Sequence, residues 1–366
     1  MRFYALVLIA FVSIAPLNAK RAKNVILFIG DAGGVSTLNA ASAYRHKAPQ
    51  KLFIQRMPNI ALSDTSASAD WVTDSAAGMT AIVTGQKTGN GVLSQSADAV
   101  RGKKDGAPLK TILEYAEEKG LSTAVMSNVS MADATPAACY AHSNSRSLTG
   151  EVVTQILSPR FGDGVDMVIG GGRKAILAAT EKMGMDFEAR LKEKGFAVAS
   201  TPAGIPKDAQ RVVALFDGPD YDPWPIVDNA IDRLSENKKG YFLMVEWDMH
   251  TDKLKQGLDR AIVMDELIGK VAAKVKGDTL IIFAADHSFD IRLRGGKIGD
   301  EMVTGNEAKE QRPRIRVDNG HTGEEVVVAA TGPGSERVRG YIPNTGVFRI
   351  MMYAYGWKES AQPPAK

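Results

Sequence analysis

The sequence predicts an α/β fold, with a doubly wound, mostly parallel sheet sandwiched between helices. Short apolar runs alternate with longer amphipathic stretches, which is typical of parallel strands joined by helices. The runs that we expect to form strands are residues 25–29, 123–126, 166–169, 212–216, 241–245, 279–284 and 325–330. Helical stretches include 109–119 and 253–276, and the second has an apolar stripe at helical spacing. No repeat and no long linker divides the chain, so we expect residues 20–366 to form a single domain.

Composition and charge exclude several functional classes. The chain has 366 residues, of which 44% are hydrophobic and 24% charged, as in an ordinary soluble globular protein. Its formal net charge is +3, and its basic residues do not cluster. We therefore expect neither a nucleic-acid-binding surface nor attraction to an anionic membrane. Cys139 is the only cysteine, so no intramolecular disulfide can form, and we interpret it as a small apolar residue on a helix.

The first nineteen residues differ from the rest. Arg2 precedes an apolar stretch from 3 to 15, and Ala19 provides a small residue at the end. This pattern predicts a secretory signal peptide over residues 1–19 and a periplasmic or secreted protein. An uncleaved anchor is the alternative, although about thirteen apolar residues are few for a bilayer span. We expect no membrane span once the signal peptide is removed.

Acidic residues follow three of the predicted strands. Asp31 ends the run that begins at Asn24, Glu246 follows 241–245, and Asp286-His287 follows 279–284. Taken singly, each would more often cap a helix or lie in a turn. In an open parallel sheet, however, ligands bind beyond the carboxyl ends of the strands, where these side chains would meet.

Such a cluster of carboxylates should hold metal ions. Carboxylates brought together repel one another unless cations neutralise them. Asp with His suits zinc, whereas an all-oxygen set that includes Thr suits magnesium. Of the five histidines, His287 and His321 lie in the polar contexts Ala-Asp-His-Ser and Asn-Gly-His-Thr-Gly, and we expect both to bind metal.

The candidate nucleophile is Ser75. Asp74 is a good N-cap, and the Ala-rich run that follows it favours a helix. Ser75 would then lie at a helix N-terminus, where free N–H groups and the helix dipole stabilise an alkoxide and attract a phosphate. A plain capping pair is the alternative, and the nearby metal cluster favours the nucleophile.

These segments occur in the order found in alkaline phosphatases. The matching segments are 24–31, 74–77 with 84–88, 133–136 with Arg146, 170–173, 245–246, 285–287 and 321–323. Over residues 24–332 the chain resembles that family. The resemblance implies hydrolysis of small phosphomonoester substrates through a phosphoserine, assisted by two Zn²⁺ and one Mg²⁺. It also makes residues 20–366 a single alkaline-phosphatase-like catalytic domain.

The resemblance also implies a role for each matching residue. One zinc, which stabilises the Ser75 alkoxide, is held by Asp31, Asp286 and His287. A second zinc, which activates water, is held by Asp252, His321 and one further ligand. The magnesium is held by Asp31, Thr135 and Glu246, with Asp133 in contact through water. Arg146 holds two phosphate oxygens, a task that suits its planar guanidinium better than a lysine.

The match to the family departs at residues 245–256. The spacing from Glu246 to Asp252 is one residue longer than the family's, and Gln256 stands where a histidine would complete the second zinc site. Either His250 supplies the missing nitrogen or Gln256 binds weakly through its amide oxygen, and we favour His250. The zinc could also be only partly occupied.

Two structural expectations follow from the resemblance. Only 33 residues separate His287 from His321, so the family's crown-like insertion should be reduced. No counterpart of the N-terminal embracing helix of some members is present, which leaves the oligomeric state open.

Two kinds of alternative remain: another enzyme of the same superfamily, which is a phosphodiesterase or a sulfatase, and a binding protein. A phosphodiesterase of the same superfamily would have no obligatory counterpart of Arg146, and a sulfatase would need a Pro- and Arg-containing motif around its nucleophile. A metal- and phosphate-binding protein without turnover is supported only by Gln256.

Overall fold

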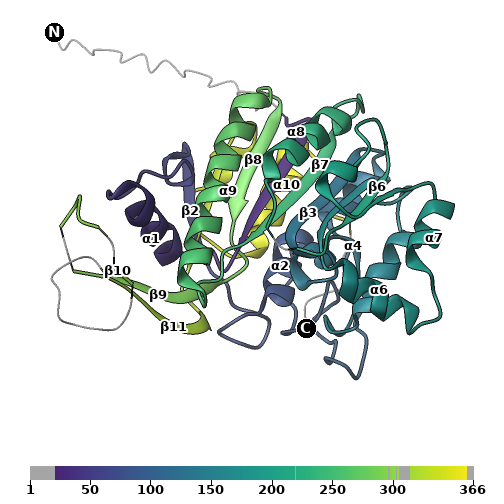
Figure 1. Cartoon of the computed structure of the whole chain (residues 1–366), viewed down its shortest axis with the longest axis horizontal. Coiled ribbons are helices and arrows are strands. Elements are labelled where there is room, and N and C mark those ends of the chain that lie inside the picture. Colours follow the sequence, from purple (N-terminus) through teal and green to yellow (C-terminus); the bar gives the residue numbers. More distant parts are fainter. Residues whose placement is uncertain (1–20, 219, 296, 302, 305–313, 361–366) are drawn as a thin grey trace, which may run out of the picture.

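The computed structural model describes residues 21–218, 220–295, 297–301, 303–304 and 314–360, so the predicted signal peptide lies outside the described residues. Ten strands form the main sheet, in the order β13-β2-β12-β8-β1-β7-β3-β4-β6-β5 (Figure 1). Their bounds are β1 Asn24–Asp31, β2 Asn59–Ser63, β3 Ser122–Ser130, β4 Met167–Gly171, β5 Ala197–Ala199, β6 Val212–Leu215, β7 Tyr241–Asp248, β8 Thr279–Ala284, β12 Val326–Thr331 and β13 Gly340–Ile342.

The seven predicted strands are all present, and the mostly parallel sheet is confirmed. The strands from β8 to β5 are parallel to their neighbours, whereas β12 pairs antiparallel with both β8 and β2. The bounds differ from expectation by a few residues, and two of the differences concern acidic residues. Asp166 lies before β4, where its carboxylate accepts a hydrogen bond from the Thr123 amide. β7 continues to Asp248, so Glu246 lies within the strand and not after it.

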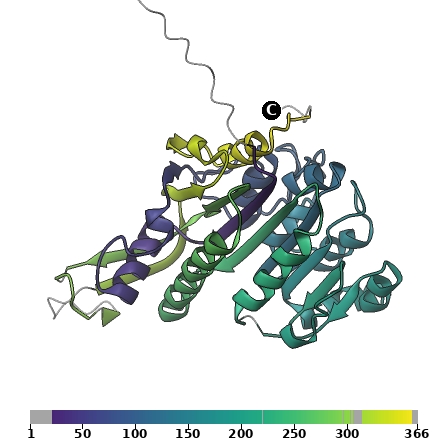
Figure 2. The same ribbon diagram turned by 90° about the horizontal axis from the view of Figure 1, so that it is seen from above.

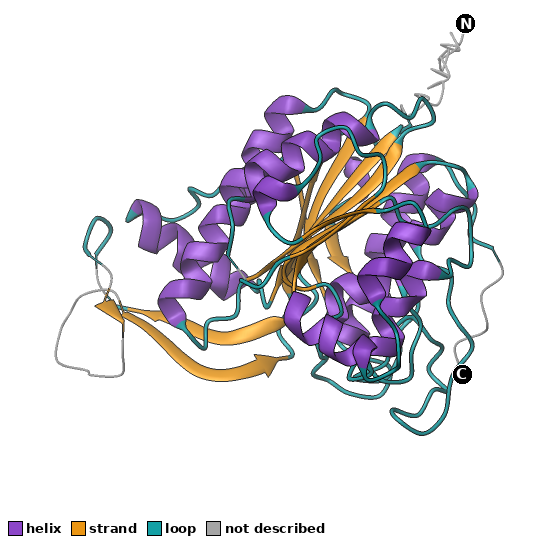
Figure 3. Cartoon of the chain, turned by 45° about the vertical axis from the view of Figure 1, so that its right-hand side comes forward, coloured by secondary structure: helices purple, strands orange, loops and turns teal. Residues whose placement is uncertain are grey.

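Helices cover both faces of the sheet, as predicted (Figure 3). One face packs against α2 Ser75–Thr84, α3 Ile112–Glu118, α4 Ala134–Tyr140, α5 Thr149–Thr154, α6 Arg173–Glu181, α7 Phe187–Glu193 and α10 Thr345–Tyr355. The other packs against α1 Val35–His46, α8 Pro223–Leu234 and α9 Leu254–Lys274. Strand β1 is buried along its whole length and contributes alternate side chains to the two cores, with Leu27 in one and Phe28 in the other. Cys139 is buried on α4, as expected of an apolar residue.

A second, small sheet lies between β8 and β12 in the chain. It contains β9 Ser288–Arg294, β10 Val303–Thr304 and β11 Arg314–Thr322, and it extends beyond α1 (Figures 1 and 2). β9 begins directly after His287, and β11 runs antiparallel to it so that His321 pairs with Phe289. This register returns the chain to the carboxyl end of β8. Among the described residues, no helix is both long and apolar enough to cross a bilayer.

Candidate active site

Four predicted site residues meet at the carboxyl ends of the central strands. Asp31 is the last residue of β1, Glu246 lies near the end of β7, and Asp286 and His287 follow β8. Since these three strands are neighbours in parallel register, their ends lie together. Asp31 is 6% exposed and the other three are fully buried, so these charged groups cannot rely on water.

Ser75 reaches this edge on the first turn of α2. Asp74 is the N-cap, since its side chain accepts a hydrogen bond from the Ala77 amide at 3.1 Å, and the predicted helix start is confirmed. Gly78, one turn later, allows α2 to approach the loop after β8. A Cβ at this position would lie 2.4 Å from the Asp286 carbonyl oxygen, so only glycine fits. The hydroxyl of Ser75 consequently lies 3.3 Å from Nε2 of His287.

Three histidine rings lie together at this edge of the sheet. His250, His287 and His321 each offer a ring nitrogen, and these atoms lie within 4.8 Å of one another. The rings of His287 and His321 stack with centroids 3.8 Å apart, and Nε2 of His250 is 3.5 Å from Nε2 of His321. Each Nδ1 faces an oxygen that can only accept, so in the neutral ring the proton is on Nδ1 and Nε2 has a free lone pair.

A second group joins two carboxylates to the same histidine. Asp31, Asp286 and His287 bring their ligand atoms within 4.8 Å of one another. Oδ1 of Asp31 lies 3.1 Å from Nε2 of His287, yet it is buried and has no hydrogen-bond donor. Burial and the Asp31 charge raise the pKa of Asp286 to about 6. Burial alone would raise the pKa of Asp31, but His250 and His287 lower it further than burial raises it.

Glu246 lacks a partner in the same way. Its Oε2 accepts a hydrogen bond of 2.5 Å from the Ser127 hydroxyl, while its buried Oε1 has none. Burial, together with the charges of Asp31, Asp133 and Asp286, raises the pKa of Glu246 well above its ordinary value. The hydroxyl of Thr135 approaches Oδ2 of Asp286 at 3.4 Å. The residues expected to hold magnesium are therefore close to this carboxylate cluster.

Arg146 lies between two carboxylates at the rim. One terminal nitrogen is 3.2 Å from Oδ2 of Asp74, the N-cap of α2, and the other is 2.6 Å from Oδ1 of Asp133. Asp133 in turn caps α4 by accepting a hydrogen bond from the Ala134 amide. The guanidinium is thus fixed between the N-termini of α2 and α4, and it contacts Asp74, which directly precedes Ser75.

The segment after β7 is arranged differently from the family pattern. His250 joins the histidine group, whereas Asp252 is exposed and belongs to neither candidate metal-binding group of the described residues. The side-chain amide of Gln256 donates to Oδ2 of Asp220 at 3.1 Å. Sequence reasoning missed Asp248, whose Oδ1 accepts a hydrogen bond of 2.7 Å from Nδ1 of His250. The signal for Asp248 in the sequence was its position two residues from both Glu246 and His250.

Comparison with known proteins identifies the family. A family model described as Alkaline phosphatase matches residues 22–195 and 224–317. The chain belongs to the alkaline phosphatase family. Membership confirms both the family that the motifs indicated and the enzyme class, a phosphoric monoester hydrolase.

Two curated alkaline phosphatases illustrate the degree of similarity. That of Escherichia coli K12 is 29% identical over 93% of this chain and 88% of its own length. The mouse (Mus musculus) tissue-nonspecific isozyme is 31% identical over 74% of this chain and 64% of its own length.

Solved alkaline phosphatases have the same fold. The enzyme of the Antarctic bacterium TAB5 superposes with a TM-score of 0.79 at 27% identity and covers 93% of this chain and 100% of that one. The Thermus thermophilus enzyme gives a TM-score of 0.79 at 22% identity, with 98% and 97% covered, and supports the fold alone.

The donor set of this alkaline phosphatase fits metal ions. Two nitrogen ligands of one tetrahedral zinc, each about 2.0–2.1 Å from the metal, lie about 3.4 Å apart. The separation of 3.5 Å between Nε2 of His250 and Nε2 of His321 is close to this value. The unpartnered oxygens of Asp31 and Glu246 are what a cation would satisfy.

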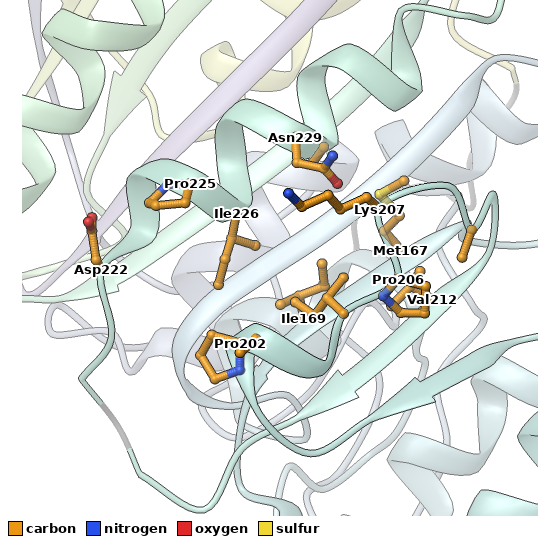
Figure 4. Close-up of a pocket in the computed structure, with 14 residues that line it drawn as sticks. Met167, Ile169, Pro202, Pro206, Lys207, Val212, Asp222, Pro225, Ile226 and Asn229 are labelled. Carbon is orange, nitrogen blue, oxygen red and sulfur yellow. The ribbon is translucent and has the colours of Figure 1, made fainter.

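An apolar cavity lies elsewhere in the molecule. It measures about 320 Å³ between β4, β6, α8 and the loop that contains Pro202 and Pro206 (Figure 4). None of its lining residues belongs to the histidine or carboxylate groups. Most of its wall is aliphatic or proline side chains, and its polar residues, Lys207, Asp222 and Asn229, form no candidate metal-binding group among the described residues.

Proposed function

We propose that this chain hydrolyses phosphate monoesters through a phosphoserine formed on Ser75. The observation that carries the proposal is the position of Ser75. Its hydroxyl lies at the N-terminus of α2 and 3.3 Å from Nε2 of His287, the residue shared by both groups of candidate metal ligands. The helix N-terminus favours the alkoxide and attracts the substrate's phosphate.

We further propose which residues hold the metal ions. One zinc would be bound by Asp31, Asp286 and His287, a second by His250 and His321, and a magnesium by Asp31, Thr135 and Glu246, with Asp133 nearby. Asp252 remains a proposed ligand of the second zinc only if its loop turns inward, because its side chain is exposed. When bound, such ions neutralise the clustered carboxylates, stabilise the attacking and leaving oxygens, and make water a better nucleophile near neutral pH. Among solved relatives, a substituted TAB5 alkaline phosphatase is described with Mg bound in its M3 site.

The protein groups then divide the remaining work. Ser75 Oγ attacks phosphorus in line with the departing alcohol, and a water molecule later cleaves the Oγ–P bond to release phosphate. The carbonyl oxygens that accept from Nδ1 of His287 and His321 hold these rings in the orientation required for ligation. Arg146 uses one N–H of each terminal nitrogen for Asp74 and Asp133, which leaves other N–H donors for two non-bridging phosphate oxygens.

The chain's processing is also part of the proposal. We infer that residues 1–19 are a cleaved signal peptide, that residues 20–366 are one catalytic domain, and that the enzyme is exported to the periplasm or secreted. An N-terminal sequence beginning at Lys20 in the mature protein would support this inference. A mature protein that still begins at Met1 would contradict it.

A direct experiment combines metal analysis with covalent trapping. The purified protein is analysed for zinc and magnesium, assayed with a monoester and a diester, and quenched in acid during turnover for peptide mass spectrometry. We expect two zinc and one magnesium per chain, faster monoester hydrolysis, and phosphate on the peptide that contains Ser75. Metal binding without phosphate release would identify a binding protein, and faster diester hydrolysis would identify a phosphodiesterase.

A further inference from the structure

His250 is held in place by a carboxylate. Oδ1 of Asp248 accepts a hydrogen bond from Nδ1 of His250 at 2.7 Å and a second from the His250 amide at 3.0 Å. The same oxygen therefore fixes both the backbone and the ring of a residue on a loop. With Nδ1 carrying its proton toward Asp248, Nε2 is left to face His321.

Asp248 is itself fixed by its neighbours. Its Oδ2 accepts a hydrogen bond of 2.5 Å from Arg260 on α9, and its amide donates to Oδ1 of Asn128 at 2.8 Å. The side chains of Asp248 and Arg260 are 17% and 12% exposed, so water screens this pair only weakly. An ion pair with little exposure and good geometry restricts the carboxylate to one position.

Arg260 is anchored in turn from its other side. Its Nε lies 2.9 Å from Oδ1 of Asp220, and the Gln256 amide donates to Oδ2 of the same carboxylate at 3.1 Å. Gln256, considered above as a possible amide ligand, therefore supports the far end of this network. The connected groups run from Gln256 through Asp220, Arg260 and Asp248 to His250.

The other two histidines of the group are held differently. Nδ1 of His287 donates to the Ser288 carbonyl at 3.1 Å, and Nδ1 of His321 donates to the Thr73 carbonyl at 3.0 Å. Of the three, His250 is the one whose Nδ1 has a charged acceptor. A carboxylate acceptor orients an imidazole more firmly than a carbonyl and increases the basicity of its other nitrogen.

We propose that Asp248 and Arg260 are positioning residues that hold His250, by its Nδ1–H, in the orientation in which its Nε2 binds zinc. This inference rests on the proposed function, in which His250 is a ligand of the second zinc. The pair thereby allows a histidine on the loop to act as the zinc ligand that Gln256 on α9 does not provide.

The test compares Asp248→Asn and Arg260→Lys with Asp259→Asn in the full mature chain. Asp259 forms an exposed ion pair with Lys255 on the same helix, so its variant is a matched control. Zinc affinity is titrated with Zn²⁺ alone, and the Nδ1–H of His250 is observed in histidine-labelled protein by ¹H–¹⁵N NMR. Loss of a residue that orients a metal ligand typically weakens metal binding by about 10–100-fold.

We expect Asp248→Asn to bind one of its two zincs about 10–100-fold more weakly, with full occupancy restored at high zinc concentration. Its downfield Nδ1–H signal should move upfield or disappear. Arg260→Lys should produce a smaller change of both kinds, and Asp259→Asn none. Unchanged zinc affinity and an unchanged Nδ1–H signal in Asp248→Asn would overturn the proposal.

Two further outcomes are informative. If excess zinc never restores the second zinc in Asp248→Asn, the carboxylate binds the metal directly and the positioning role is wrong. Failure of the underlying function looks different, because the unsubstituted protein would then bind fewer than two zincs or release no phosphate.

Discussion

Two pairs of buried carboxylates in this molecule have opposite surroundings. Asp31 and Glu246, at the strand ends, are 6% and 0% exposed, while Glu114 and Glu117 on α3 are 5% and 4% exposed. In the first pair, Oδ1 of Asp31 and Oε1 of Glu246 have no hydrogen-bond donor. In the second pair, every carboxylate oxygen has a partner.

The partners of the α3 pair come from the surrounding protein. Glu114 accepts from the Thr111 amide at 3.0 Å, which completes a capping box, and both its oxygens contact Arg160. Glu117 accepts from the Thr123 hydroxyl at 2.5 Å and from the Gly164 amide at 3.1 Å. Burial raises the pKa of each glutamate to about 7.

The difference shows what distinguishes a site from a buried polar network. Low exposure and a raised pKa are common to Glu114, Glu117 and Glu246, so neither identifies a site. A buried carboxylate oxygen without a donor, such as Oδ1 of Asp31 beside Nε2 of His287, suits a cation, whereas a fully hydrogen-bonded carboxylate has no need of one. The four predictions below test this distinction, beginning with the largest expected effect.

Ser75→Ala should reduce phosphate release by several orders of magnitude while the fold persists. A nucleophile that works with an electrostatically prepared site contributes roughly 10³–10⁶-fold, by analogy with the hydrolase triads. Initial rates on a phosphomonoester, with zinc content and the thermal midpoint measured in parallel, check this result. Phosphate release at the unsubstituted rate would remove Ser75 as nucleophile.

His250→Ala should lower zinc content by about one atom per chain, whereas Gln256→Ala should leave it nearly intact. Imidazole nitrogen is a strong zinc ligand and a neutral amide oxygen a weak one. The loss should slow phosphoserine hydrolysis more than its formation, which rapid-quench kinetics can separate. Gln256→His is the complementary variant, since it could supply a ligand from the helix.

Glu114→Gln provides the control from the second region, since Gln also completes a capping box. Its metal content should be unchanged. If Gln256→Ala loses zinc while His250→Ala keeps it, the helix and not the loop completes the site.

Arg146→Ala should weaken hydrolysis of monoesters more than that of diesters. A charged hydrogen bond contributes about 1.5–3 kcal/mol, and a monoester offers the guanidinium an additional charged oxygen. The ratio of kcat/KM for matched monoester and diester substrates measures the effect. Equal losses on both substrates would mean that Arg146 has only a structural role, as the shared ion-pair partner of Asp74 and Asp133.

The sequence predicted the centre of the molecule better than its edges. Long, fully buried parallel strands such as β1 and β8 are continuous apolar runs, and an acidic residue at their ends is visible in the sequence. The edge strand β13 has three residues and is mostly exposed, so it has no apolar pattern to recognise.

Contacts between distant segments were the least predictable part of the site. The pairing of His321 with Phe289 depends on the register of β9 and β11, which follows from long-range packing. The bond between Asp248 and Arg260 depends on how α9 lies against the end of β7. No local spacing records either contact, which explains why His250 could be proposed from the sequence while the role of Arg260 could not.

The smallest effect concerns the region without a site. Burial and the charges of Asp166 and Asp163 raise the pKa of Glu117 to about 7 in the folded protein, above its ordinary value of 4.5. Because the folded state prefers the protonated form, the stability contributed by Glu117 is fully present below pH 4.5 and is lost as pH rises through about 7. Glu117→Gln avoids this loss, since an amide stays neutral and can still pair with Thr123 and Gly164. We therefore expect the free energy of unfolding of Glu117→Gln to exceed that of the unsubstituted chain by about 1–3 kcal/mol at pH 8.5, and by much less at pH 5.

Urea unfolding at both pH values measures the difference, with metal concentrations held constant. Glu118→Gln is the matched control, because Glu118 is an exposed neighbour paired with Lys110 and should show no gain at high pH. If the effect of Glu117→Gln does not depend on pH, the hydrogen bonds from Thr123 and Gly164 keep Glu117 ionised and its pKa is not raised. The two regions would then differ in the pKa of their buried carboxylates as well as in their unpartnered oxygens.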